Sequence, residues 1–344
     1  MTTSKQRAIA ACTVIAAAVA TSIASGQPAK PADPIQVALQ NAYDGLKNLQ
    51  EGSNADYIPA LAKVDPKLFG IALVTVDGKV YTAGDVKSEV SIQSISKVFT
   101  MALVFQEKGE DAVRDNIGVD ATGQAFNSIV AVEQNKGSEM NPLVNAGAIT
   151  TTSMVQGENE PAIWNTILNT YDAYAGRRLT VNEDVYRSEA ATNQRNQAIG
   201  MLMFAYGHIK TKPLQAVDLY TKQCSVNVNA VDLATMAATL ANGGKNPVTH
   251  KSVLEPRFVP GVLAVMATAG LYDDSGQWLF ATGLPAKSGV GGGLIAVVPG
   301  KFGIAVISPP LDKAGNSVRG QRAIEQVAKA LHANPYASEP ALNL

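Results

Sequence analysis

Two side chains in the first third of the chain have the types and spacing for nucleophilic chemistry. Ser94 and Lys97 stand three residues apart, and apolar residues at helical spacing follow them, among them Val98, Met101 and Phe105. A helix that begins here places both side chains on one face, one turn apart. The helix end stabilises a serine alkoxide, and a buried lysine loses its proton more readily and can act as a base. The pattern therefore suggests a serine acyl-transfer site.

This pattern is weak without further context, because chance gives about one S-x-x-K match in a chain of this length. A capped helix with a solvated lysine would then be the better interpretation. Residues 287–289, Lys-Ser-Gly, supply the context, since they precede a β-rich segment. A K-[ST]-G strand accompanies S-x-x-K in the serine β-lactamases and penicillin-binding proteins. Together the two motifs favour a serine acyl-transfer enzyme.

Other chemistries have less support. The three histidines, His208, His250 and His332, are far apart, and the sequence has no zinc motif. Cys224 could pair with His208 as a thiol dyad, but a lone cysteine in an apolar protein is more often a small buried side chain. The glycine-rich run 289–293 enters a strand and lacks the lysine and hydroxyl of a P-loop. We expect no metal and no cofactor.

The elements that hold these residues belong to a mixed α/β protein. The chain has 344 residues, of which 46% are apolar and 17% charged, and this composition excludes a disordered or coiled-coil protein. The formal net charge of −1 gives no electrostatic reason to expect nucleic acid as a partner. One large core, or two intimately packed ones, fits this length.

The first 26 residues resemble a secretory signal peptide. Lys5 and Arg7 form a basic start, and an alanine-rich apolar run over residues 8–24 precedes small residues. The run is too weakly hydrophobic for a stable membrane span. We expect an exported protein, periplasmic or secreted, with no stable membrane span in the mature chain and with residues 27–34 as a linker. An interfacial or disordered N-terminus is the alternative.

Turn signals near both ends of the chain predict two β-hairpins. β-rich residues flank Asp77-Gly78 over 69–81, and a second pair of β-rich runs over 294–308 flanks Pro299-Gly300. The region between the hairpins is mostly helical. The fold class is therefore α+β: an antiparallel sheet from both chain ends, flanked by helices, with an inserted helical subdomain.

Apolar spacing predicts three clear helices, over residues 37–49, 230–241 and 316–332, the last with Asn316 as its cap. The expected boundaries are sheet parts at about 65–93 and 260–333, a helical insert at about 94–259, and a C-terminal tail at 334–344.

Longer motifs resemble the serine-dependent glutaminases, over residues 35–333 and without large gaps. The matching segments are residues 55–59, 91–97, 141–149, 188–189 with 195–196, 220–225, 236–244, 270–273, 283–289 and 308–320. The resemblance implies a β-lactamase-like fold, shared with the penicillin-binding proteins. It also implies a glutaminase, an amidohydrolase that converts L-glutamine to L-glutamate and ammonia, and a homodimer or homotetramer.

The resemblance also implies a role for each matched position. Ser94 corresponds to the nucleophile, Lys97 to its base, Tyr272 to the tyrosine that relays a proton to the leaving ammonia, and Tyr57 to a second tyrosine near the nucleophile. The positions that contact glutamine in the family fall on Tyr57, Ser94, Asn145, Glu189, Asn196, Tyr220, Tyr272 and Val290.

The charges of glutamine agree with this set, because its ammonium and carboxylate are both costly to bury unpaired. We expect Glu189 to pair with the ammonium, while Asn145, Asn196 and a tyrosine hydroxyl donate to the carboxylate. The backbone N–H groups of Ser94 and Val290 would form the oxyanion hole. Each side chain also has a structural alternative, as a helix cap, a surface acid or a core tyrosine.

Two other functions remain open at this point. One is a penicillin-recognising serine hydrolase or peptidase, which would turn over a chromogenic cephalosporin and not glutamine. The other is a non-catalytic ligand sensor on the same fold, which would hold a persistent acyl adduct without turnover.

Overall fold

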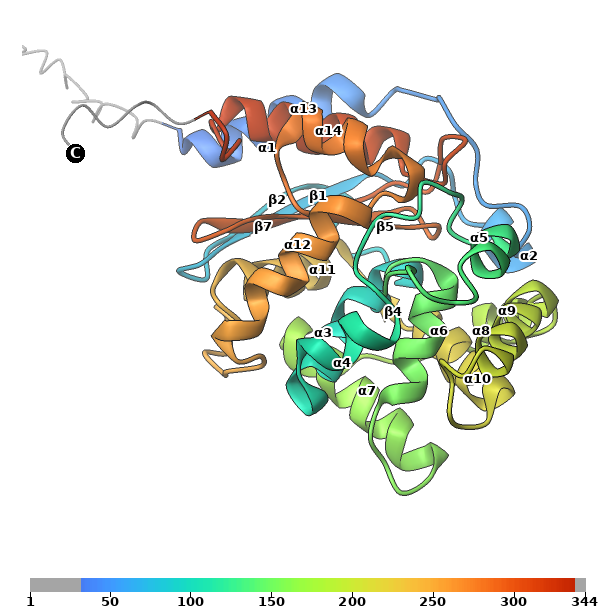
Figure 1. Cartoon of the computed structure of the whole chain (residues 1–344). Coiled ribbons are helices and arrows are strands. Elements are labelled where there is room, and N and C mark those ends of the chain that lie inside the picture. Colours follow the sequence, from blue (N-terminus) through green and yellow to red (C-terminus); the bar gives the residue numbers. More distant parts are fainter. Residues whose placement is uncertain (1–31, 338–344) are drawn as a thin grey trace, which may run out of the picture. The chain divides into compact units, whose positions relative to one another are not determined.

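A five-stranded antiparallel sheet lies at the centre of the computed structural model, which describes residues 32–337 (Figure 1). The strand order is β2-β1-β7-β6-β5. The bounds are β1 (Gly70–Thr75), β2 (Val80–Gly84), β5 (Ala286–Gly289), β6 (Gly293–Val298) and β7 (Phe302–Ile307). Because β1 pairs with β7, the sheet joins the two ends of the chain, and the predicted α+β class is confirmed. The predicted leader lies outside the described residues.

Both predicted hairpins are present. β1 and β2 pair with Val74 opposite Val80, and β6 and β7 pair with Val298 opposite Phe302. Gly78 and Gly300 in the two turns have φ values of +85° and +72°. This left-handed conformation favours glycine, which explains why the two dipeptides were reliable signals.

Side chains alternate between the two faces of the sheet. In β1, Ile71 and Leu73 pack in one core, which α1 (Pro34–Leu46) and α14 (Val318–Ala330) cover. Ala72 and Val74 pack in a second core on the opposite face. Figure 1 shows α1, α13 and α14 on one side of the sheet and the remaining long helices on the other.

The second face is covered by α11 (Ala230–Ala241), which has the predicted bounds and packs against β1, β6 and β7. A Cβ at Gly303 of β7 would lie 2.1 Å from the backbone nitrogen of Ala238, so the close approach of helix and strand requires glycine here. The helical region therefore contributes a layer of the sheet domain.

The last helix begins later than predicted. α14 starts at Val318, and its cap is Ser317, whose Oγ accepts a hydrogen bond from the backbone N–H of Gly320. The prediction that Asn316 is the cap is wrong. Asn316 is fully buried, and its Oδ1 accepts a hydrogen bond of 2.6 Å from Ser288 Oγ. Both residue types are good caps, so the sequence alone could not choose between neighbours.

The other elements lie mostly between the two hairpins. They are α2 (Pro59–Ala62), α3 (Ser96–Lys108), α4 (Glu110–Asn116), α5 (Ile129–Gln134), α6 (Asn145–Met154), α7 (Glu160–Ala175), α8 (Glu183–Ala190), α9 (Gln194–Ala205), α10 (Pro213–Cys224), α12 (Val259–Ala269), α13 (Ser275–Thr282) and a two-stranded pair, β3 (Val90–Ser91) with β4 (Asn227–Val228). Three-residue 3₁₀ turns occur at Gln93–Ile95, Pro256–Phe258 and Tyr272–Asp274. No helix within residues 32–337 is long and apolar enough to cross a membrane.

Candidate active site

Ser94 and Lys97 lie at the start of α3, as the spacing predicts. Ser94 belongs to the 3₁₀ turn Gln93–Ile95, which leads directly into α3, and Lys97 is in the first turn of that helix. Ser94 lines a cavity of about 260 Å³, whereas Lys97 is completely buried. A ligand in the cavity can therefore reach the Ser94 hydroxyl, whereas the neighbouring Lys97 amine is shielded from solvent.

Lys97 has an environment that suits a neutral amine. Its Nζ donates to the backbone oxygen of Leu143 at 3.2 Å and to Asn145 Oδ1 at 2.7 Å, and it forms no ion pair within the described residues. Burial lowers the pKa of Lys97 to about 7. A neutral amine has two N–H groups and one lone pair, so these two carbonyl oxygens use both N–H groups and leave the lone pair available.

No hydrogen bond joins Lys97 to Ser94 in the part of the chain that the structure describes. Such bonds are often long before substrate binds and shorten in the reacting complex.

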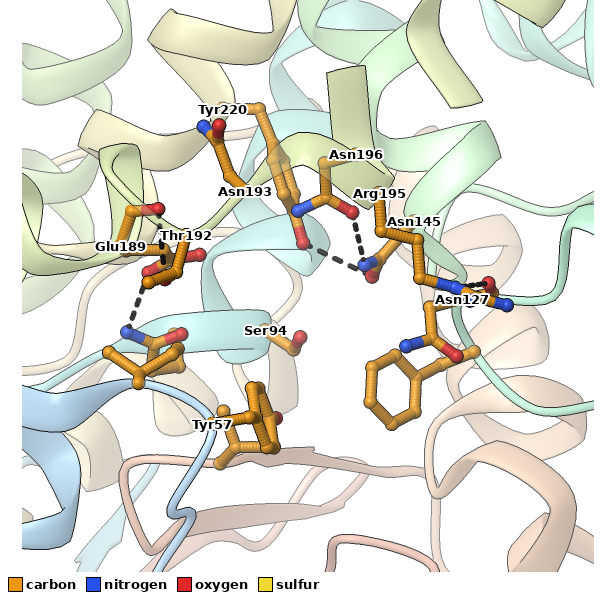
Figure 2. Close-up of a pocket in the computed structure, with 14 residues that line it drawn as sticks. Tyr57, Ser94, Asn127, Asn145, Glu189, Thr192, Asn193, Arg195, Asn196 and Tyr220 are labelled. Atoms are coloured by element: carbon orange, nitrogen blue, oxygen red, sulfur yellow. Dashed lines mark hydrogen bonds between the residues drawn. The ribbon is translucent and has the colours of Figure 1, made fainter. Parts of the chain in front are cut away.

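A buried carboxylate lies on one side of Ser94 and a group of neutral side chains on the other (Figure 2). The carboxylate belongs to Glu189, which lies near the end of α8. This residue is only 7% exposed. Its Oε2 accepts a hydrogen bond of 3.2 Å from Gln93 Nε2. Burial raises the pKa of Glu189 to about 7, while the Gln93 hydrogen bond and the Lys97 charge act in the opposite direction.

The neutral group consists of Asn145, Asn196 and Tyr220, which come from α6, α9 and α10. Asn145 Nδ2 donates to Asn196 Oδ1 at 2.9 Å, and the Tyr220 hydroxyl donates to Asn145 Oδ1 at 3.2 Å. Asn145 thus connects this group to Lys97 through the same oxygen. An acid and a set of uncharged donors on opposite sides of a cavity match the zwitterionic head of an amino acid.

Tyr272 lies beside Ser94 in a strained backbone conformation, with φ of +58°. Ser275 supports this turn, because its Oγ donates to the Tyr272 backbone oxygen at 2.7 Å. Burial raises the pKa of Tyr272 to about 12. Hydrogen bonds of its hydroxyl with Ser94 and Ser288 lower this pKa and offset part of the rise. The hydroxyl is therefore protonated at neutral pH and close to Ser94.

Lys287 is a second buried amine at this site. Its Nζ donates to the backbone oxygen of Ser288 at 2.7 Å and lies 4.1 Å from the centre of the Tyr272 ring. Burial and the nearby Lys97 lower the pKa of Lys287 well below its usual range. The lysine of the K-S-G motif thus contacts the ring of Tyr272, the predicted catalytic tyrosine.

Val290 lines the same cavity as Ser94, between β5 and β6. Its backbone N–H makes no hydrogen bond with the described residues and is free to donate to a ligand. The glycines around it allow close contact with the segment before Ser94. A Cβ at Gly291 would lie 2.4 Å from the backbone oxygen of Ser91.

Tyr57 is the most exposed of the predicted residues, at 53%, and lies in the loop before α2. It also lines the cavity, and Figure 2 shows it on the opposite side of Ser94 from Tyr220.

The cavity also contains residues that sequence reasoning did not single out: Ile58, Gln93, Phe126, Asn127, Thr192, Asn193 and Arg195. Phe126 contacts the Tyr272 ring, with centroids 4.7 Å apart, and Arg195 Nε donates to the backbone oxygen of Asn127 at 2.8 Å. Phe126 and Asn127 lie outside any helix or strand, where no periodic pattern marks them. Gln93 directly precedes Ser94 in the sequence, and this position is a signal that could have marked it.

The thiol dyad is not formed. The Cys224 Sγ lies 3.9 Å from Ser96 Oγ, and burial raises the pKa of the thiol to about 12. The ring of His208 contacts the backbone oxygens of Asn116 and Lys136 instead. Among residues 32–337, no cluster of three or more His, Cys, Asp or Glu side chains is placed to hold a metal ion.

The structure places a Ser-Lys pair at a helix start beside a K-S-G strand, an arrangement typical of hydrolases of the β-lactamase-like class. The glutaminase family model matches residues 52–336. The chain belongs to the glutaminase family, which confirms the resemblance and the enzyme class inferred from the sequence.

Several relatives carry the same name. A glutaminase of Colwellia psychrerythraea is 55% identical over 300 residues, which cover 87% of this chain and 96% of that protein. Glutaminase 1 of Escherichia coli K12 is 48% identical over 305 residues, covering 89% and 98%.

Solved structures agree in fold. The probable glutaminase ybaS superposes with a TM-score of 0.88 at 48% identity, covering 90% of this chain and all of that one. Mglu in its glutamate form superposes with a TM-score of 0.84 at 35% identity, covering 89% and 70%. These similarities confirm the predicted β-lactamase-like fold.

Proposed function

We propose that this protein hydrolyses L-glutamine to L-glutamate and ammonia through an ester between Ser94 and the glutamyl group. The observation that carries the proposal is the buried Lys97 amine, which has no acidic partner among residues 32–337 and lies one helical turn from a serine that lines the cavity. Mglu, a structural relative, has a glutamate form, and glutamate is the product of this reaction.

In the acylation step, the neutral Lys97 amine accepts the proton of Ser94 Oγ, and this oxygen attacks the side-chain amide carbon of glutamine. The carbonyl oxygen becomes an oxyanion that the Ser94 and Val290 N–H groups stabilise. The C–N bond then breaks as the Tyr272 hydroxyl passes a proton to the leaving nitrogen. Tyr272 recovers a proton from the Lys97 ammonium, ammonia leaves, and Ser94 carries the glutamyl ester.

In the deacylation step, water attacks the ester carbon while Lys97 accepts its proton. The second tetrahedral intermediate uses the same N–H groups. Its collapse breaks the ester bond, returns the proton to Ser94 Oγ and releases glutamate. No metal or cofactor takes part in this scheme.

The amino-acid head of glutamine is held at two poles. The Glu189 carboxylate pairs with the α-ammonium, and Asn145, Asn196 and a tyrosine hydroxyl donate to the α-carboxylate. Tyr57, at the half-exposed edge of the cavity, covers the bound substrate. Burial makes both poles selective, since an unpaired charge in this cavity would be costly.

The test is ammonia release from L-glutamine, L-asparagine and D-glutamine, together with turnover of a chromogenic cephalosporin. We expect L-glutamine to be hydrolysed and Ser94→Ala to lose at least about a thousandfold in rate. Ser96→Ala is the matched control, because Ser96 is a buried hydroxyl in the same helical turn that does not line the cavity. Cephalosporin turnover without ammonia release from glutamine would contradict the proposal, as would an active Ser94→Ala variant.

We also propose export to the periplasm or the medium, with cleavage near residue 26. The support is the basic start at Lys5 and Arg7, followed by the apolar run over residues 8–24. Expression of the full chain in a bacterium, followed by cell fractionation and N-terminal sequencing, tests this. A cytosolic protein that retains residue 1 would contradict it.

A homodimer or homotetramer is proposed on the family resemblance. Met201 and Phe204 of α9, which are 48% and 46% exposed, provide apolar surface consistent with an interface. Light scattering on the purified protein tests this, and a monomer at the assay concentration would contradict it.

A further inference from the structure

Gln93 combines two unusual features beside the nucleophile. Its φ is +49°, in the left-handed region that residues with a Cβ rarely adopt, and its side chain is 97% buried at the wall of the cavity. Strained backbone of this kind persists where the surrounding structure requires it, and it is common at functional sites.

The side-chain amide of Gln93 has a fixed orientation. Its Nε2 lies 3.2 Å from Glu189 Oε2 and 3.2 Å from Ser91 Oγ. An amide nitrogen has two N–H groups, so these two acceptors use both of them. Within residues 32–337, no other side chain donates a hydrogen bond to the Glu189 carboxylate. The direction in which that carboxylate points therefore depends on Gln93.

We propose that Gln93 is a positioning residue that aims the Glu189 carboxylate at the α-ammonium of the substrate and so determines selectivity for α-amino acids. The inference rests on the proposed function, in which Glu189 binds that ammonium. The left-handed backbone serves the same purpose, because it turns the Gln93 side chain toward Glu189 while Ser94 faces the cavity.

The charge of the carboxylate depends on the same contact. Burial raises the pKa of Glu189, and the hydrogen bond from Gln93 lowers it, as does the Lys97 charge from α3. The other titratable groups around Glu189 are Tyr57, Tyr220 and Cys224, whose pKa values are raised from ordinary values of 10.0, 10.0 and 9.0, so all three are neutral near pH 7. Loss of the Gln93 amide leaves Glu189 more often protonated and free to turn away.

The experiment uses Gln93→Met, which keeps the length of the side chain and removes its hydrogen bonds. We expect KM for L-glutamine to rise about 10- to 100-fold with kcat within a few-fold, since the contact to a charged group acts in ground and transition states alike. The inhibition constant of L-glutamate should rise by a similar factor, while that of glutarate, which lacks the ammonium, stays unchanged. The acid limb of kcat/KM should move to higher pH.

Two further variants keep the result interpretable. Gln223→Met removes another buried glutamine, outside the cavity, and should leave both inhibition constants unchanged. Gln93→Gly removes the amide but accepts the left-handed backbone, so it should reproduce the effect on KM even if Gln93→Met folds poorly.

Comparison with Glu189→Gln distinguishes the role of Gln93 from the existence of the ammonium site at Glu189. If Glu189→Gln weakens L-glutamate but not glutarate, while the Gln93 variants weaken both inhibitors equally or neither, the role of Gln93 is refuted and the ammonium site stands. If Glu189→Gln shows no such selectivity, the ammonium site itself is wrong and the inference falls with it.

Discussion

Glu189→Gln should halve the steepness with which activity falls at acidic pH. In the proposed mechanism the free enzyme needs a neutral Lys97 and an ionised Glu189, and the pKa of each is about 7. For Lys97 this is a fall from 10.5, which corresponds to about 5 kcal/mol, and for Glu189 a rise from 4.5, or about 3 kcal/mol. Both groups must lose a proton as the pH rises through 7, so both limit activity below this pH.

The expected profile follows from these two values. Log kcat/KM reports the free enzyme and should fall with a slope approaching two below pH 7, reaching about a hundredfold loss at pH 6. In Glu189→Gln only Lys97 titrates, so log kcat/KM should fall with a slope of one. Its plateau value should be lower than in the wild type, and the loss from that plateau at pH 6 should be about tenfold. Log kcat should show a slope of one in both proteins, because the bound ammonium keeps Glu189 ionised.

The assay is a coupled measurement of ammonia release between pH 5 and 9 at constant ionic strength, with stability at each pH checked by preincubation. Glu183→Gln, an exposed glutamate on the same helix, is the control and should keep the wild-type profile. A wild-type slope of one, or a slope of two that survives in Glu189→Gln, would refute the reasoning.

Three further variants test the surrounding structure. Lys97→Met should change the free energy of unfolding more favourably at pH 6 than at pH 10, by about 4 kcal/mol, because the depressed folded-state pKa of Lys97 destabilises the fold fully below about pH 7 and not above its unfolded value of 10.5. Urea unfolding at both pH values measures this, and a change no more favourable at pH 6 than at pH 10 would speak against a strained buried amine. Tyr272→Phe should lower kcat about a hundredfold with KM within a few-fold in steady-state kinetics, since the hydroxyl acts on the leaving group; an unchanged kcat would remove Tyr272 from the proton relay. Gly291→Ala should lower kcat at least about tenfold, because its Cβ would meet the Ser91 oxygen at 2.4 Å. Gly276→Ala is the control and should leave kcat unchanged in the same assay, because a Cβ there meets no atom within 4 Å. Equal effects of the two substitutions would show that close packing at Gly291 is unimportant.

Local chemistry explains which elements the sequence predicted well. The Asp77-Gly78 and Pro299-Gly300 turns need a left-handed glycine, and both hairpins are where those dipeptides place them. Helix boundaries were predicted less accurately. α1 starts at Pro34 and not at residue 37, because Asp33 caps it and a proline suits the first helical position.

The site was predictable in part. The spacing of Ser94 and Lys97 fixes their relation on one helix, but the acceptors that hold the Lys97 amine belong to Leu143 and Asn145, far along the chain. No local pattern contains such a contact, and only the resemblance pointed to Asn145, Glu189 and the other predicted substrate-binding positions. The left-handed Gln93 was unforeseeable for the same reason, since tertiary contacts impose that conformation on a residue that does not favour it.

The most direct test of the account is rapid acid quenching of the enzyme mixed with L-glutamine, followed by intact-mass measurement and peptide mapping. We expect a species heavier by one glutamyl group, with the ester on Ser94, that forms within the first turnover and is absent from Ser94→Ala. An adduct on Cys224, or ammonia release through the first turnover by Ser94→Ala at the wild-type rate, would contradict the central claim.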